Sequence, residues 1–190
     1  MAWNSDSPDE ELMLSYCDGD AGAFDILYRR HRGGLYRYIL RLCANAGVAD
    51  ELFQDVWTNL IRARRNYTVR AKFTTYLYRL AHNRVVDHIR AQGGRTALSL
   101  DDDDAPEIHE PAAAPRDQPE TALETRQQAA RLLELLAALP AVQREAFLLQ
   151  QEGGLSIEEI AEATGVARET AKSRLRYALA KLRQGMSAWL

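Results

Sequence analysis

The sequence predicts an all-α protein of two small helical domains, and three observations support that prediction. Apolar residues recur at spacings of three and four along most of the chain, and no stretch alternates apolar and polar residues between turn signals. Four of the six prolines fall between residues 106 and 119, in a segment without apolar periodicity. The 190 residues, 46% of them apolar, suffice for one ordinary core or two small ones. We therefore expect domains at residues 1–95 and 121–190, joined by a linker at 96–120.

Residues 20–91 are expected to form the helices of the first domain. Asp20 can cap a helix that Gly33 and Gly34 are predicted to end, after which the apolar pattern resumes. A third helix follows the turn at 45–47 and has one apolar face. The other face of that helix presents four polar residues, which are Asp50, Glu51, Gln54 and Asp55.

The fourth helix, expected over residues 72–91, is predicted to carry a nucleic-acid surface. Its apolar residues, Phe73 among them, lie on one broad face, and polar and basic residues lie nearly in line on the opposite face. Cationic side chains bind phosphates, aromatic rings stack on unpaired bases, and asparagine can pair with a base edge. Tyr67 and Tyr76 are the aromatic residues best suited to such stacking, although either could instead belong to the core. The polar stripe consists of Lys72, Arg79, Asn83 and Arg90.

The charges are segregated along the chain, although the net charge is only −3. Residues 62–95 carry nine bases and one acid, and residues 168–183 carry six bases and one acid. Residues 96–120, which lie between these blocks, carry eight acids and one base. Two basic blocks are typical of a protein that touches a polyanion at two places, although two solvated helix faces would give the same pattern. The acidic segment cannot bury enough apolar surface to fold and is expected to be an extended tether.

The second domain is predicted to contain a helix-turn-helix motif. Two helices are expected at residues 123–139 and 142–151. Ser156 and Glu159 form a capping box that opens the next helix, and Gly165 supplies the tight turn before the last one. In this motif the second helix enters the major groove, so its outward residues are the expected readers and anchors of duplex DNA. They are Arg168, Glu169, Lys172, Ser173 and Arg176.

Three segments together resemble the extracytoplasmic-function (ECF) family of bacterial RNA polymerase sigma factors. They are DELFQDVWTNL (50–60), FTTYLYRLAHNRVVDHIR (73–90) and LPAVQREAFLLQQEGGLSIEEIAEATGVARETAKSRLRYALAKLR (139–183). The resemblance implies a sigma region 2-like domain that binds core RNA polymerase and reads and opens the −10 promoter element. It also implies a sigma region 4-like domain that binds the −35 element of promoter DNA. An anti-sigma factor as partner, a cytoplasmic location, no cofactor and no enzymatic activity follow from the same resemblance.

The resemblance also assigns residues to each surface. The four polar residues of the third helix would bind polymerase, and the acidic linker would thread the polymerase channels. The −35 surface gains Thr170 and Arg174 beside the five residues named above. The −10 surface comprises Tyr67, Lys72, Tyr76, Arg79, Asn83, Asp87, His88 and Arg90.

The chain departs from the family pattern at three positions. Tyr76 stands where the family usually has Trp, which reduces the area for stacking on a base. Ala167 precedes the recognition helix where the family commonly has a capping residue, and the lost cap costs about 1 kcal/mol. Tyr177 stands where the family often has Arg, which removes one phosphate contact. We expect weaker or differently specific DNA contacts at these points.

Other functions fit the sequence less well. A stand-alone helix-turn-helix regulator is the alternative, but it would leave the polar third helix and the basic, aromatic fourth helix unexplained. A metal-dependent hydrolase is disfavoured because His82 and His88 lie about 120° apart on one helix. Cys17 and Cys43 form no CxxC pair and are expected to be reduced thiols. The acidic N-terminal segment and the lack of a long apolar run argue against a signal peptide and a membrane span.

Overall fold

The computed structural model describes residue 3, residues 6–93 and residues 122–187. None of these residues lies in a strand, so the all-α prediction is confirmed for the described part of the chain. The predicted linker at 96–120 lies outside the described residues. The N-terminal half (6–93) contains α1 (Asp9–Cys17), α2 (Ala21–Cys43), α3 (Ala46–Ala63), the 3-10 helix η1 (Arg64–Asn66) and α4 (Phe73–Ala91). The C-terminal half (122–187) contains α5 (Ala122–Ala138), α6 (Ala141–Gly153), α7 (Ile157–Thr164) and α8 (Arg168–Met186).

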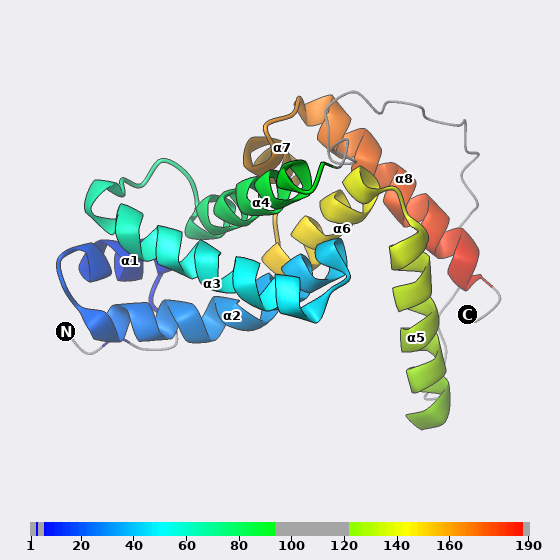
Figure 1. The fold of residues 1–190 in the computed structure, drawn as a ribbon, viewed down its shortest axis with the longest axis horizontal. Coiled ribbons are helices and arrows are strands. Elements are labelled where there is room, and N and C mark those ends of the chain that lie inside the picture. The colour runs from blue at the N-terminus through cyan, green and yellow to red at the C-terminus, as the bar shows by residue number, and fades with distance from the viewer. Residues whose placement is uncertain (1–2, 4–5, 94–121, 188–190) are drawn as a thin grey trace.

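The helices of the N-terminal half pack together (Figure 1) around one apolar core, and two of them begin at side-chain caps. The carboxylate of Asp20 accepts hydrogen bonds from the amides of Gly22 (2.9 Å) and Ala23 (3.3 Å), as predicted. Asn45 caps α3 by accepting from the amide of Val48 (3.1 Å). Each bond satisfies an amide that has no partner inside its own helix. The core includes Leu12, Leu27, Leu35, Leu52, Val56, Leu60, Phe73 and Leu77, all fully buried.

Helix α1, which the sequence analysis did not anticipate, supplies the cap that α4 lacks. Lys72 is the N-cap residue of α4 and makes no side-chain cap bond. A carboxylate oxygen of Glu10 on α1 accepts instead from the amide of Phe73 (2.6 Å). Asp9, also on α1, holds this helix to α2 through His31 (2.6 Å) and Arg30. Because the cap of α4 comes from a distant segment, local sequence patterns give no sign of it.

Helix α2 runs without a break through Gly33 and Gly34, so the prediction that these glycines end a helix is wrong. Glycine disfavours a helix interior by about 1 kcal/mol relative to alanine, but packing of a long amphipathic helix can override that preference. Gly34 has a packing role instead. A Cβ at this position would lie 2.8 Å from the backbone oxygen of Glu152 on α6. The glycine thus permits the close approach of α6 to α2.

The C-terminal half contains the predicted helix-turn-helix motif, formed by α7 and α8. Ser156 accepts from the amide of Glu159 (3.3 Å), and the carboxylate of Glu159 accepts from the amide of Ser156 (2.8 Å), so the predicted capping box is present. Gly165 ends α7 with a φ of 69°, a left-handed conformation that glycine adopts readily. Ala167 precedes α8 and makes no side-chain cap bond, because alanine has no side-chain acceptor.

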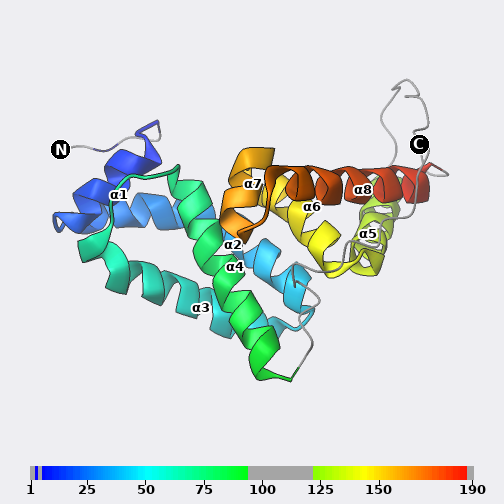
Figure 2. The same cartoon turned by 90° about the horizontal axis from the view of Figure 1, so that it is seen from above.

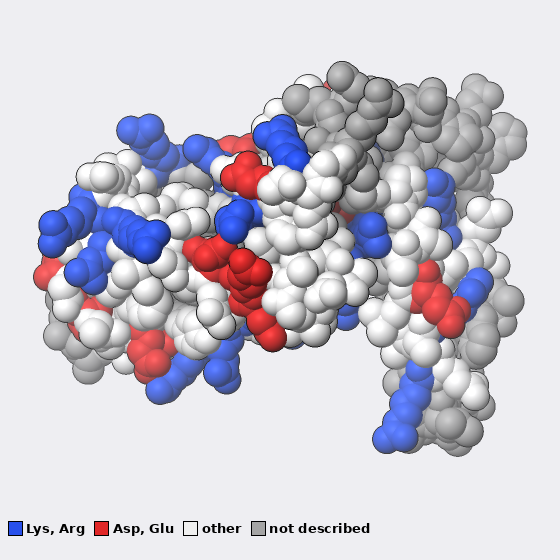
Figure 3. Space-filling view, in the orientation of Figure 1, with Lys and Arg blue, Asp and Glu red and all other residues white. Residues whose placement is uncertain are grey.

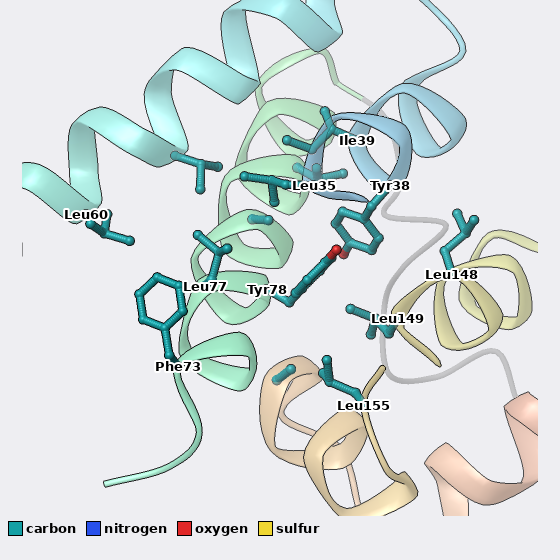
Figure 4. Close-up of a cluster of buried hydrophobic side chains, with 14 of the residues drawn as sticks. Leu35, Tyr38, Ile39, Leu60, Phe73, Leu77, Tyr78, Leu148, Leu149 and Leu155 are labelled. Atoms are coloured by element: carbon teal, nitrogen blue, oxygen red, sulfur yellow. The ribbon is translucent and has the colours of Figure 1, made fainter. Parts of the chain in front are cut away.

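The two halves are packed against each other and share one core (Figure 2). Helix α2 contacts α6, and α4 contacts both α6 and α7. Figure 4 shows Tyr38 of α2 and Tyr78 of α4 pointing toward each other beside Leu148 and Leu149 of α6. The two rings meet edge to face, with centroids 5.3 Å apart. The sequence analysis predicted two small helical domains and did not foresee a core that they share.

Helix α4 is buried on a second side because of this packing. Thr75, Tyr78 and His82 follow one another at spacings of three and four and face the C-terminal half. Thr75 and Tyr78 are 1% exposed. The polar stripe is therefore confined to the side of α4 that the shared core does not cover.

Candidate nucleic-acid interface

The predicted polar stripe of α4 is exposed to solvent. Lys72, Arg79, Asn83 and Arg90 are all exposed, as is Asp87. His88 is half-buried, and its Nε2 lies 3.0 Å from the amide nitrogen of Gln92. The spacing of these residues therefore gives the accessible surface that the sequence analysis expected, with Lys72 and Arg79 before the amide of Asn83 and Arg90 after it.

A pocket of about 270 Å³ opens beside this stripe, between α4 and the segment that precedes it. Tyr67 and Tyr76 line it together, with ring centroids 5.3 Å apart and planes inclined by 60°. Arg70 and Arg79 belong to the same lining. One wall comes from the other half of the chain, since Glu162 of α7 also lines the pocket.

Two hydroxyl groups of the pocket residues have no hydrogen-bond partner among the described residues. They belong to Tyr67 and Thr75, and both oxygens are buried. A buried hydroxyl without a partner costs free energy, which a ligand with a matching donor or acceptor would recover. Burial, followed by the charge of Glu10, raises the pKa of Tyr67 to about 12, so its hydroxyl stays protonated at neutral pH and can donate. Neither Thr75 nor Glu162 was identified from sequence, and only the fold brings them to the pocket.

The polar face of α3 forms a separate acidic surface. Asp50, Glu51 and Gln54 are exposed, and Figure 3 shows acidic side chains gathered over α3. Asp55 is half-buried and bound by Arg84 of α4 at 2.7 Å, so it also holds two helices together. A hydrogen bond to Asp50 raises the pKa of Tyr36. All four predicted residues lie on one helix face, and three of them are exposed where a partner surface could contact them.

The recognition helix α8 presents most, but not all, of its predicted DNA residues. Arg168, Glu169, Lys172 and Arg176 are exposed, whereas Thr170 and Ser173 are half-buried. Arg174 is only 8% exposed. The sequence analysis placed Arg174 among the DNA-facing residues. The structure instead buries it on the inward face of α8, with Leu175.

The exposed cations of α8 are held by nearby acids and by one ring. Arg168 pairs with Glu158 (2.6 Å) and Glu169 (3.0 Å), which raises the pKa of its guanidinium through the hydrogen bond and charge of Glu158. The guanidinium of Arg176 lies over the ring of Tyr177, 5.0 Å from its centroid. These contacts are on the surface, where they contribute little to stability. Either arginine can therefore exchange its protein partner for a DNA phosphate.

Three acids of the C-terminal half bind the N-terminal half, and the sequence analysis missed all of these contacts. Glu145 lies between the hydroxyl of Tyr38 (2.8 Å) and Nδ1 of His82 (2.7 Å). Further along, Glu152 pairs with two arginines of α2, and Glu159 pairs with Lys72. The contact with Glu145 also gives His82 a structural role. Among the described residues, no group of three or more His, Cys, Asp or Glu side chains could hold a metal ion.

Comparison with known proteins gives the family. The model of sigma-70 region 2 matches residues 27–95, and that of sigma-70 region 4 matches residues 129–182. The chain is 30% identical over 172 residues to the RNA polymerase sigma factor CarQ of Myxococcus xanthus, covering 90% of this chain and 94% of CarQ. It is 30% identical over 174 residues to the ECF RNA polymerase sigma factor SigM of Mycobacterium tuberculosis, covering 92% of this chain and 82% of SigM.

Solved structures give the same fold. The sigma factor RpoE of Bartonella quintana, crystallised with the anti-sigma factor NepR, superimposes with a TM-score of 0.63 at 23% identity and covers 86% of this chain and 96% of RpoE. None of the described helices is long and apolar enough to span a membrane. Since region 2 and region 4 are matched in order and most of the length of both relatives is covered, the chain belongs to the extracytoplasmic-function family of RNA polymerase sigma factors.

Proposed function

We propose that this sigma subunit reads the −10 element with the pocket and polar stripe of α4, binds the −35 element with α8, and holds core RNA polymerase with the acidic face of α3. Family membership makes the chain a promoter-specificity subunit that directs polymerase to start transcription. The observation that carries the residue assignment is the pocket. Its paired rings, unpartnered hydroxyls and lining arginine residues occur together beside the stripe.

The pocket suits an unpaired base that has flipped out of the stacked bases of DNA. Tyr67 and Tyr76 offer ring faces on which any base can stack, and stacking is worth about 1–3 kcal/mol per base. The unpartnered hydroxyls of Tyr67 and Thr75 can bond to base edges. Lys72, Arg79 and Arg90 can bind the phosphates of the same strand. Strand opening in this mechanism is a shift in binding equilibrium, so the proposal requires neither catalytic residues nor a cofactor.

The upstream contact is the weaker part of the surface. Arg168, Lys172 and Arg176 stand ready for phosphates or base edges of the −35 element, with Glu169, Thr170 and Ser173 beside them. The amides at the start of α8 have no side-chain cap, and a DNA phosphate could take that place. Arg174 would reach the −35 element only if the C-terminal half rearranged on DNA.

The partners follow from the same assignment. The residues Asp50, Glu51, Gln54 and Asp55 are proposed to bind the large catalytic subunit of core polymerase in the cytoplasm. RpoE of Bartonella quintana is held by an anti-sigma factor, and we propose a partner of that class for this chain. The residues of the linker at 96–120 are proposed to pass through the polymerase channels.

Permanganate footprinting of initiation complexes tests the −10 assignment. Tyr76→Ala and Asn83→Ala are expected to reduce the reactivity of unpaired thymines in the bubble, because each removes a group proposed to hold the opened strand. Gln184→Ala is the matched control, since this exposed amide lies near the end of α8, away from the pocket. A bubble of unchanged size and intensity in both variants would refute the assignment.

A further inference from the structure

Helix α1 contacts both η1 and α4, the two elements joined by the segment that forms one wall of the pocket. We refer to this segment, residues 66–71, as the pocket segment. Just before it, the thiol of Cys17 donates a hydrogen bond to the carbonyl oxygen of Arg64 (2.9 Å). The guanidinium of Arg64 in turn donates to the hydroxyl of Tyr16 (3.2 Å) and lies over its ring. Helix α1 thus fixes the position at which the pocket segment begins.

The same helix fixes the other end of the pocket segment through Glu10. Its carboxylate accepts from the amide of Phe73 (2.6 Å), at the point where the two walls of the pocket meet. Tyr67 belongs to the pocket segment and Tyr76 to α4, so the two rings lie on opposite sides of this point in the chain. Their centroids are 5.3 Å apart, a spacing that depends on the direction in which the chain enters α4. Lys72 provides no cap, so this direction depends on Glu10.

Glu10 also brings a negative charge close to the proposed −10 surface. Burial, followed by the charge of Glu10, raises the pKa of Tyr67. The hydrogen bond and charge of Glu159 raise the pKa of Lys72, and the charge of Glu10 adds to this effect. A carboxylate near this lysine opposes the approach of a DNA phosphate, although salt screens the repulsion. The hydrogen bond and the charge of one side chain therefore act on DNA binding in opposite directions.

From these contacts we infer that Glu10 is a positioning residue for reading of the −10 element, because it fixes the entry of the chain into α4 and with it the pairing of Tyr67 and Tyr76. The inference rests on the proposed function of the pocket. Glu10 acts through the backbone at Phe73 and touches no base itself. Rings that are already in place bind a base with a smaller loss of conformational freedom than rings that must first be ordered. This gain exceeds the repulsion caused by the charge of Glu10.

Three replacements of Glu10 in the full chain separate the hydrogen bond from the charge. Glu10→Gln keeps an acceptor for the amide and removes the charge. Glu10→Asp keeps the charge, but its side chain is one methylene shorter and draws the acceptor away from the amide. Glu10→Ala removes both. The matched controls carry the same three replacements at Glu11, which is exposed on the same helix.

The probe is an oligothymidine of about a dozen nucleotides with one central 2-aminopurine, a fluorescent base that is quenched when it stacks on an aromatic ring. Anisotropy of a separate end label gives the dissociation constant. The fluorescence of 2-aminopurine at saturation reports stacking in the pocket. Both are measured at low and at high salt, at a temperature well below the melting temperature of every variant. Circular dichroism checks that helix content is equal in all the proteins.

The hydrogen bond and the charge give different expected results. Glu10→Gln should quench the probe as strongly as the parent chain and bind it about twofold more tightly at low salt, a gain that disappears at high salt. Glu10→Asp should bind at least about threefold more weakly at both salt concentrations and quench the probe less, because the cap is lost. Glu10→Ala should also quench less, with an affinity between those of the parent chain and Glu10→Asp at low salt. The Glu11 controls should quench as the parent chain does.

The outcomes separate this inference from the proposed function. If Glu10→Asp and Glu10→Ala melt at lower temperatures but bind and quench as the parent chain does, Glu10 only stabilises the fold and the positioning role is refuted. Weaker binding with full quenching, or an equal loss of quenching in the Glu11 controls, would refute it as well. In each of these cases the pocket assignment stands as long as Tyr76→Ala weakens binding and quenching. If Tyr76→Ala changes neither, the pocket assignment fails, and the positioning role fails with it.

Discussion

The hydroxyl of Tyr38 on α2 donates a hydrogen bond of 2.8 Å to Glu145 on α6, deep in the core that the two halves share. Tyr38 is fully buried, and burial, followed by the charge of Glu145, raises the pKa of its phenol well above the usual value. The tyrosine is therefore a donor at any physiological pH. The carboxylate of Glu145 is its only described acceptor, which makes the pair a sensitive point for stability.

Glu145→Ala is expected to destabilise the chain by about 2 kcal/mol, because it leaves the buried hydroxyl of Tyr38 without an acceptor. Glu145→Gln retains a carbonyl acceptor and should cost less. Thermal unfolding followed by circular dichroism measures both. Equal melting temperatures for the alanine and glutamine variants would contradict the role given to this bond.

Gly34→Ala and Gly33→Ala form a matched pair with opposite expected results. Both replacements raise helix propensity, by about 1 kcal/mol in an interior position. At 34 the new Cβ would meet the backbone oxygen of Glu152 at 2.8 Å, so the melting temperature should fall. At 33 the nearest atom is the flexible end of Arg37 at 3.3 Å, so the melting temperature should rise. A rise at both positions would show that α6 does not press on α2.

Glu10→Ala should destabilise α4 by about 1 kcal/mol, because it removes the acceptor for the amide of Phe73. Glu11→Ala is the control, since Glu11 is exposed on the same helix. Amide hydrogen exchange in the first turn of α4 is the direct measurement. Faster exchange in both variants alike would point to a general loss of α1 and not to a lost cap.

Asp9 should make stability depend on pH in the acid range. Burial alone would raise its pKa, but the hydrogen bonds and charges of His31 and Arg30 outweigh burial and hold the pKa below the ordinary value of 3.8. A lowered folded-state pKa stabilises the fold above pH 3.8, and this stabilisation is lost as pH falls through the lowered pKa. Denaturant titrations between neutral pH and pH 3 should show a shallower acid loss for Asp9→Asn than for the parent chain.

Ala167→Ser should stabilise α8 by about 1 kcal/mol, because serine can accept from the uncapped amides at the start of that helix. Ser156→Ala, at the equivalent position of α7, should destabilise by a similar amount, since it breaks the capping box. The two melting temperatures should therefore move in opposite directions. A shift of both in the same direction would mean that capping does not control this motif.

Local signals predicted the features that depend on a few neighbouring residues. The cap at Asp20, the capping box of Ser156 and Glu159, and the turn at Gly165 all occur where the sequence placed them. The exposed stripe of α4 was found for the same reason, because helical spacing alone decides which residues share a face. Helix α1 was missed, and its contribution to α4 comes through the distant Glu10.

Features that depend on contacts between distant segments could not be predicted. The continuity of α2 through Gly34 and the burial of Arg174 each depend on packing against another helix. The pocket was half found, because Tyr67 and Tyr76 were named, whereas Thr75 and Glu162 join them only through the packing of α7 on α4. The helical spacing of Thr75, Tyr78 and His82 was, however, a signal in the sequence for the second buried side of α4.

Tyr78 lies between a glycine from each half of the chain. A Cβ at Gly34 would come within 3.0 Å of its hydroxyl, and a Cβ at Gly153 would come within 2.9 Å of its ring. Contacts this tight leave no room for one helix to slide along the other by a fraction of a turn. Tightly packed interfaces of this kind switch between discrete states instead of deforming gradually. Any movement of α6 relative to α2 and α4 should consequently be all-or-none, because Tyr78 fixes the register of this contact.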